Sequence, residues 1–284
     1  MKPLALMLAA AFALATPARA QQFGSIGSLA DSLAAFKGVT KGVAHAMGAA
    51  AQDSVSINGL AVSPMPDISA YPVRGADVSH YQGAIDWTKL KGAGLSFVYI
   101  KATEGDDSVD DEFARNWKGA SDAGLAKGAY HFYDFCKAGS AQAANFIRTV
   151  PAEAGDLPPT VDIEQSRDCA KMPTKAAFQK SLKAFLAKVE TAYGRQPVLY
   201  VNDSIYKQFL SGADDGLKLW ISDPHHQAPV MPDQKPWALW QFSFTGHLAG
   251  IAGEVDLDVF NGTPQMLASL TQPSSSPVML AALP

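Results

Sequence analysis

Apolar strand-like runs and helical segments alternate along residues 72–262. In 174–193, for example, Phe178, Leu182, Phe185 and Val189 recur at the spacing of one helix face. Repeated strand–helix units predict a parallel sheet, and about eight strands in one unit predict an α/β barrel whose last third lacks helices. The predicted strands are 73–79, 95–102, 127–135, 159–164, 196–202, 217–222, 237–242 and 254–259, and the predicted helices are 111–123, 141–150, 174–193 and 203–210.

The segments on either side of this core have a different composition. Residues 1–20 combine Lys2, an apolar run over 4–14 and an Ala-Arg-Ala ending, which predicts an export signal cleaved after Ala20. The run is shorter than the ~20 apolar residues of a spanning helix, so we expect no membrane span and a periplasmic or extracellular protein. Residues 21–71 are rich in Ala, Gly and Ser and predict a flexible extension with one weak helix, and 263–284 predict a linker-like tail.

Charge and cysteine content narrow the class of partner. The formal net charge of −4 becomes −6, 21 basic against 27 acidic residues, when Lys2 and Arg19 leave with the signal. This acidity argues against nucleic acid, which is bound mainly by Lys and Arg. An oxidising compartment favours a disulfide between Cys136 and Cys169, and two thiols are too few for a typical structural zinc site. We expect a monomer with no cofactor and no metal.

Acidic residues gather where the predicted strands stop. Asp162 and Glu164 alternate along one strand, so their side chains point the same way. Burying two neighbouring carboxylates is costly and raises the pKa of one of them, and we expect Glu164 to stay protonated as a general acid. Active sites of parallel α/β barrels lie at the C-terminal ends of the strands, and this rule selects Asp77, Asp162, Glu164 and Asn202, with Asp256 and Asp258 on the last strand.

Other side chains near the strand ends decide between kinds of site. Two other roles for the acids are possible besides catalysis. They could form ion pairs with Lys101 or Arg74, or bind a metal together with His225 and His226, although we interpret the two histidines as loop residues. Strand alternation puts one pair of the run 130–133 in the lumen, and sugar faces, being apolar, stack well on aromatic rings. A Gly-rich phosphate loop and a Gly-x-Ser-x-Gly elbow are both absent from the sequence. The pattern therefore favours a carbohydrate groove, with substrate contacts from Lys101, Tyr130, Phe132, Tyr200, Asn202, Trp240 and Asp258.

Seven motifs, in order, resemble glycoside hydrolase family 25, the Chalaropsis-type lysozymes. They lie at 75–83, 97–105, 128–133, 162–164, 200–202, 240–242 and 255–260. The resemblance implies a modified TIM barrel of the form (β/α)5(β)3. It also implies hydrolysis of the β-1,4 bond from N-acetylmuramic acid to N-acetylglucosamine in the glycan strands of peptidoglycan. Carried over to this chain, it makes Glu164 the general acid and Asp162 its acidic partner, and it places Asp77 and Asp256 in the same catalytic site.

One position departs from the family pattern, and it keeps an alternative open. The family commonly has Asn after Val-Asp-Leu, where this chain has Asp258. On strand parity Asp258 faces the lumen with Asp256, so we expect it to add negative charge there. A catalytically weakened peptidoglycan-binding protein is therefore one alternative function, and a chitinase-like hydrolase is another.

The spacing of Asp162 and Glu164 bears on the mechanism. The two residues lie beside each other on one strand rather than on opposite sides of a scissile bond. Substrate-assisted hydrolysis, a recognised exception to the two-carboxylate scheme, suits this placement. We therefore expect the N-acetyl oxygen of the substrate to attack, with Asp162 orienting the N-acetyl group.

Overall fold

The computed structural model describes residues 55–57, 60–62, 65–164, 169–213, 216, 218–231 and 233–272. The chain divides into two compact units, 1–53 and 54–284, and every described residue belongs to the second. The predicted export signal and the weak helix of the extension lie outside the described residues. Within them, no helix reaches the length and hydrophobicity of a membrane-spanning one.

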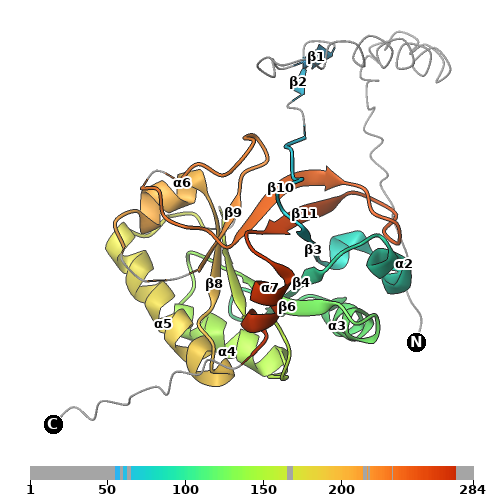
Figure 1. Ribbon diagram of the computed structural model, residues 1–284. Helices are drawn as coiled ribbons and strands as arrows, with labels where there is room; N and C mark the ends of the chain where they lie inside the picture. The colour runs from blue at the N-terminus through green and yellow to red at the C-terminus, as the bar shows by residue number, and fades with distance from the viewer. Residues whose placement is uncertain are drawn as a thin grey trace, which may run out of the picture. The chain divides into compact units, whose positions relative to one another are not determined.

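Eight strands close into a barrel (Figure 1). The first strand pairs with the second on one side and with the last on the other, which leaves no free edge in the ring. A short strand, β5 (Ser108–Val109), pairs with the C-terminal end of the second barrel strand, and β1 (Val55–Ile57) forms a separate hairpin with β2 (Leu60–Val62). The barrel strands are β3 (Val73–Val78), β4 (Phe97–Glu104), β6 (Ala126–Phe132), β7 (Thr160–Ile163), β8 (Val198–Asn202), β9 (Lys218–Ser222), β10 (Leu239–Gly246) and β11 (Val255–Phe260).

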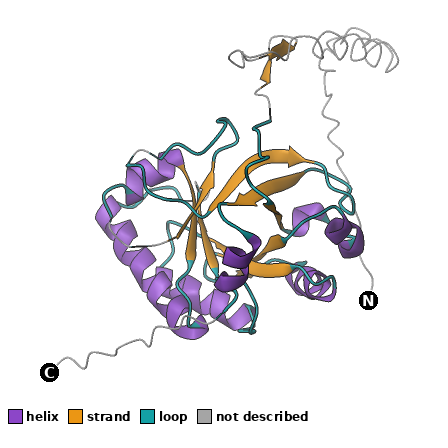
Figure 2. Ribbon diagram, in the orientation of Figure 1, coloured by secondary structure: helices purple, strands orange, loops and turns teal. Residues whose placement is uncertain are grey.

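Helices follow the first five barrel strands and lie on the outside of the barrel, as Figure 2 shows. In the described parts of 218–255, the connections between β9, β10 and β11 contain no helix, so the predicted (β/α)5(β)3 arrangement is confirmed. The helices of these units are α2 (Trp87–Gly92), α3 (Phe113–Asp122), α4 (Gly139–Thr149), α5 (Lys175–Tyr193) and α6 (Asp203–Ile205), which continues as the π-helical turn η2 (Tyr206–Leu210), and a 3-10 turn, η1 (His80–Gln82), follows β3.

The last strand runs in the opposite direction to the other seven. β11 is antiparallel to both β10 and β3, whereas the remaining barrel pairs are parallel. The fully parallel sheet that the strand–helix alternation predicts is therefore wrong for this strand. Because β11 is reversed, its beginning lies at the C-terminal edge of its neighbours, and Asp256 sits opposite Asp77 while Asp258 lies deeper, opposite Gly75.

Strand alternation separates two apolar layers. Side chains that face outward pack against the helices, and one of them, His131, stacks on Phe185 of α5 at 5.0 Å between ring centroids. Inward-facing rings fill the lower lumen, where a Cβ on Gly75 or Gly128 would lie 2.3 Å from the ring of Phe97 or Tyr99. Glycine at these two positions therefore leaves room for the rings. Because these rings fill the lower part of the barrel lumen, a cavity inside the barrel can open only at its upper rim.

Besides the short β5 and η1, three parts of the described structure were not predicted from the sequence. The helix α2 is short, with only Trp87 and Leu90 buried, and the β1–β2 hairpin falls in the stretch predicted as a flexible extension. The third element, α7 (Pro264–Leu270), occupies the start of the predicted linker-like tail. Thr263 caps α7 by accepting a hydrogen bond from the backbone of the first turn, and Leu267 packs against the apolar residues of the lower lumen.

Candidate active site

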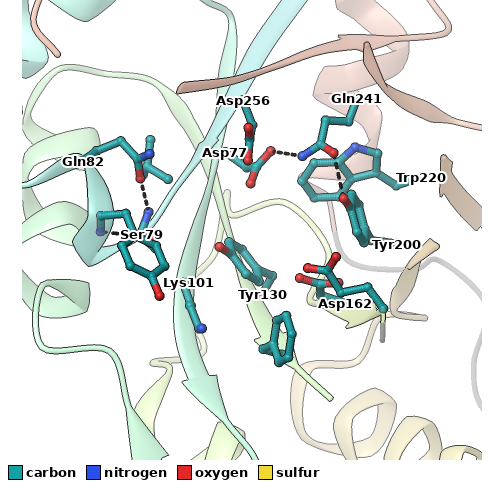
Figure 3. A pocket seen from close by; sticks show the side chains of 14 residues that line it. Asp77, Ser79, Gln82, Lys101, Tyr130, Asp162, Tyr200, Trp220, Gln241 and Asp256 are labelled. Atoms are coloured by element: carbon teal, nitrogen blue, oxygen red, sulfur yellow. Dashed lines mark hydrogen bonds between the residues drawn. The ribbon is translucent and has the colours of Figure 1, made fainter. Parts of the chain in front are cut away.

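A pocket of about 180 Å³ opens at the rim where the parallel strands end (Figure 3). Its walls carry four carboxyl groups, one lysine and several aromatic rings. Asp162 lies between Phe132 and Tyr200, its register partners on β6 and β8. The residues that line the pocket are Asp77, Val78, Ser79, Tyr81, Gln82, Lys101, Tyr130, Phe132, Asp162, Glu164, Tyr200, Trp220, Gln241 and Asp256.

Hydrogen bonds fix the wall formed by β3, β8 and β10. Tyr200 Oη donates to Gln241 Oε1 at 2.7 Å, and Gln241 Nε2 donates to Asp77 Oδ2 at 2.8 Å (Figure 3). Ser222 Oγ also donates to Gln241 Oε1, at 3.1 Å. This chain of bonds orients the carboxyl group of Asp77 and leaves Gln241 no freedom to rotate without breaking three contacts.

Asp162 on β7 is buried, and Glu164, which directly follows β7, is half-buried. Asp162 is 8% exposed, and within the described structure its Oδ1 has no hydrogen-bond partner. Burial, followed by the nearby charges of Glu164 and Asp77, raises the pKa of Asp162 well above its usual range. Burial also raises the pKa of Glu164, and the charge of Lys101 partly offsets this rise. From the sequence we expected a raised pKa for Glu164 alone. The pKa values of Asp162 and Glu164 are both raised, because burial acts on the two groups.

The acids on β3 and the upper part of β11 also hold protons more tightly than usual. Burial is the largest cause for both, and it raises the pKa of Asp77 to about 6 and that of Asp256 to about 8. The hydrogen bond from Gln241 works against the rise at Asp77, whereas the charges of Asp77 and Glu164 add to the rise at Asp256. The pKa of Asp256 is therefore raised further than that of its neighbour Asp77.

Asp258 is fully buried below the pocket and does not line it. Its Oδ1 accepts a hydrogen bond from Trp220 Nε1 at 2.9 Å. Burial and the charges of Asp77 and Asp256 raise the pKa of Asp258 well above its usual range. As a carboxylate, its Oδ2 would have no donor; as a neutral acid it donates to Asp77, and this bond lowers the pKa of Asp77. Burial therefore opposes the added negative charge that we expected at Asp258 from the sequence.

Most of the remaining residues that were predicted to contact substrate line the pocket, whereas Asn202 and Trp240 do not. Lys101, Tyr130, Phe132 and Tyr200 line the pocket, and Lys101 Nζ bonds Glu104 Oε2 at 2.7 Å while lying 4.8 Å from the centre of the Phe132 ring. Asn202 lies outside this pocket, where its side chain accepts from the backbone N–H of Ile205 and caps α6.

Trp240 does not reach the pocket. It is fully buried on the outer face of β10, where it packs against Tyr71, Trp237 and Phe242, and its Nε1 donates to the carbonyl oxygen of Asp223. Its position does not fit the expected substrate contact. On β10 the polar residue Gln241 faces inward, and it is one that the sequence analysis did not select. Gln241 could have been found from the sequence, because it alternates along the strand with Trp240 and Phe242 and so faces the opposite side.

A disulfide joins Cys136, which follows β6, to Cys169, which follows β7. The bond ties together two loops at the same end of the barrel as the pocket. Within the described residues, Asp134 and the two cysteine sulfurs form the one group of potential metal ligands within reach of a common ion. Because both sulfurs are bonded to each other, neither is available as a thiolate ligand.

Comparison with known proteins places this pocket in a family. The sequence model of the glycosyl hydrolases of family 25 matches residues 76–251. Lysozyme M1 of Streptomyces globisporus is 36% identical over 209 residues, 70% of this chain and 71% of that protein. The N,O-diacetylmuramidase of a Chalaropsis species is 29% identical over 202 residues, 65% of this chain and 96% of that protein. A family 25 glycosyl hydrolase structure from Bacillus anthracis has a TM-score of 0.67 at 30% identity, covering 78% of this chain and 99% of that one.

The matched segment contains most of the pocket. It begins within β3 and ends before β11, so it includes Asp77, Asp162 and Glu164, whereas Asp256 joins the site through the pairing of β11 with β3. The resemblance seen in the sequence motifs is confirmed by both the family match and the barrel. The chain belongs to the glycosyl hydrolases of family 25 and is a glycosidase.

Proposed function

We propose that this protein cuts the glycan strands of peptidoglycan at the β-1,4 bond from N-acetylmuramic acid to N-acetylglucosamine. Glu164 acts as the general acid, and the N-acetyl oxygen of the substrate acts as the nucleophile. The lysozyme and muramidase names of its relatives support the substrate. The observation that carries the mechanism is the buried Oδ1 of Asp162 in the pocket, which has no hydrogen-bond partner among the described residues.

Glu164 supplies and then recovers one proton. Its raised pKa favours the protonated acid, which donates to the glycosidic oxygen as the bond to the anomeric carbon breaks. The N-acetyl carbonyl oxygen forms a bond to the same carbon and gives a cyclic cation. Water then opens this ring from the side of the departed sugar and returns a proton to the Glu164 carboxylate, so the configuration is retained.

Asp162 is placed to control the attacking N-acetyl group. A buried carboxyl oxygen without a hydrogen-bond partner is costly, and an amide N–H of the substrate would satisfy it. As a carboxylate, Asp162 would hold that N–H, turn the carbonyl oxygen toward the anomeric carbon and stabilise the positive charge of the cyclic cation. The charges of Glu164 and Asp77 contribute to the raised pKa of Asp162, so the protonation of Asp162 depends on the charge of both neighbours.

The facing wall offers a competing route. Asp77 comes from β3, three strands around the barrel from β7, and Asp256 comes from β11, four strands away. A carboxylate there would attack the anomeric carbon directly in a retaining enzyme or activate water in an inverting one. Inversion at the anomeric carbon would exclude the substrate-assisted route. Retention combined with loss of cleavage on de-N-acetylated glycan would favour it over a protein nucleophile.

Export to the cell wall is part of the same proposal. The charged start, short apolar run and Ala-Arg-Ala ending of residues 1–20 support it. A glycosidase that cuts peptidoglycan must reach it outside the cytoplasm. N-terminal sequencing of the protein recovered from outside the cytoplasm should give Gln21 as the first residue; an intact leader would contradict the export signal.

Digestion of purified peptidoglycan by residues 21–284 and by Glu164→Gln tests the activity. We expect products with N-acetylmuramic acid at the reducing end from the wild type, identified by mass spectrometry after reduction. The variant should be slower by about 10²–10⁴-fold, the usual contribution of a general acid. Products ending in N-acetylglucosamine would assign a different bond. Peptidoglycan binding without any product would favour the weakened binding protein, and cleavage of chitin alone would favour the chitinase-like hydrolase.

A further inference from the structure

A second, larger hollow of about 750 Å³ adjoins the active-site pocket over the ends of β8 and β9. Among the described residues, Glu164 is the one that lines both cavities. The larger groove is lined by loop and strand-end residues and includes Asn202, Ser222, His226 and Phe244. The acid of the proposed mechanism therefore stands at the boundary between a small pocket and a long groove.

The position of Asp162 indicates which sugar lies on each side of Glu164. Asp162, the proposed partner of the N-acetyl group, lies in the small pocket and not in the groove. The attacking N-acetyl group belongs to the sugar whose anomeric carbon reacts, so that sugar occupies the small pocket. The acid protonates the leaving oxygen on the other side of the scissile bond. This places the leaving sugar beyond Glu164, in the groove.

The groove wall carries an exposed aromatic ring suited to a sugar. β10 pairs with β9 only through Leu239–Gln241, and its later residues continue past that pairing with β11 alone. Phe244 lies in this extension and is 47% exposed, although exposing a large apolar ring to water is unfavourable. The apolar face of a pyranose would cover it, while polar side chains such as Asn202 and Ser222 lie on other parts of the groove wall.

We infer that the groove binds the leaving-group side of the glycan, with Phe244 as a stacking platform for a sugar beyond the scissile bond. The inference rests on the proposed function, because it takes Glu164 as the acid. It assigns the two cavities different sugars: the small pocket holds the reacting muramic acid, and the groove holds the N-acetylglucosamine that leaves and the sugars attached to it. Phe244 then governs which glycans are accepted and takes no part in the chemistry.

Two substrates separate binding in the groove from the reaction in the pocket. The first is a tetrasaccharide of alternating N-acetylglucosamine and N-acetylmuramic acid, which fills both cavities. The second is the β-fluoride of the N-acetylglucosaminyl–N-acetylmuramic acid disaccharide, whose small leaving group reaches no groove residue. Phe244→Ala should raise KM for the tetrasaccharide about five- to ten-fold, the size of one aromatic stacking contact, and leave the fluoride unchanged.

Met266→Ala is the matched control, since Met266 is 51% exposed on α7 and lines neither cavity. It should match the wild type on both substrates. An unchanged KM for Phe244→Ala on the tetrasaccharide, or an equal loss on both substrates, would overturn the inference. Glu164→Gln tests the proposed function separately: it should lose the tetrasaccharide reaction and keep much of the fluoride reaction, because fluoride leaves with little need of an acid. Full tetrasaccharide activity in Glu164→Gln would overturn both proposals.

Discussion

The two acidic walls of the pocket contain the same kind of residue in different surroundings. At the end of β7, Asp162 is buried and Glu164 is half-buried, and one oxygen of Asp162 has no partner in the described structure. On β3 and β11, Gln241 donates to Asp77 and Trp220 donates to Asp258 Oδ1, and the Asp258 oxygen that has no donor in the described structure faces Asp77, to which a neutral Asp258 can donate. The first wall keeps its hydrogen-bonding capacity for a substrate, whereas the second uses that capacity within the protein.

This difference shows how a barrel can keep five carboxyl groups close together. Burial raises the pKa of each, so several stay neutral at the pH where isolated carboxyls would be charged. A neutral acid can donate a hydrogen bond, which converts a repelling neighbour into a supporting one. The supported wall is therefore expected to contribute mainly to stability and the unsupported wall mainly to catalysis.

The largest expected effect is on the β7 wall. Asp162→Asn should lower kcat on the tetrasaccharide about 100-fold, because an amide cannot provide the negative charge that stabilises the cyclic cation. Steady-state kinetics measure this loss, and a thermal melt checks that the variant is folded. Wild-type kcat in a folded Asp162→Asn protein would remove the distinction between the two walls.

The supported wall is tested at Asp258, with an intermediate effect. Asp258→Leu should lower the free energy of unfolding by about 2 kcal/mol, since Trp220 Nε1 loses its acceptor and Asp77 loses a donor. Asp258→Asn has nearly the same size, and its amide can accept from Trp220 while donating to Asp77. We expect it to cost less than ~1 kcal/mol and to keep activity.

Denaturant titration near pH 6 compares these two variants with the wild type. If Asp258 were a charged group, Asn would remove a repulsion from Asp77 and stabilise the protein. A clear gain in stability for Asp258→Asn would therefore contradict a neutral acid at this position.

The smallest expected effect is a pH dependence of stability. Asp77 and Asp256 have higher pKa values in the folded protein than in the unfolded chain, so folding favours their protonated forms. Their contribution is complete below about pH 4, the usual range for Asp, and is lost as pH rises through about 6 for Asp77 and about 8 for Asp256.

We expect the melting temperature to fall by about 2–4 °C between pH 5 and pH 9, a modest figure because Asp256 is partly exposed to solvent. Differential scanning calorimetry measures this slope. Asp256→Asn should flatten its upper part, because an amide does not titrate there. A slope that is identical in Asp256→Asn and the wild type would place the titrating groups elsewhere.

Periodic segments of the sequence predicted most of the fold. The helix predicted at 174–193 is observed as Lys175–Tyr193, because its apolar spacing, the Thr174 cap and Gly194 all mark the same element. The direction of β11 was not predictable in this way, since alternation along a strand reads the same in both directions. Short elements such as α2 bury too few residues to give a periodic signal.

Predictability of the site followed the same division. Strand parity correctly put Tyr130 and Asp162 in one pocket, because parity depends only on local geometry. Strand parity does not show how deeply a side chain is buried. The raised pKa of Asp258, which burial causes, was therefore not predicted. Trp240 was selected as an aromatic near a strand end, and its outward position depends on which residues cover β10 in the absence of a helix.

That cover has a consequence for where the folded unit begins. Trp240 and Phe242 face outward on a strand that none of the described helices shields, and Ile68 and Tyr71, ahead of β3, pack against them. A recombinant protein shortened to start at Val73 would keep every barrel strand and every carboxyl of the pocket, yet leave this aromatic surface open to water. Such a protein is expected to self-associate, and one that starts before Ile68 is expected to remain dispersed.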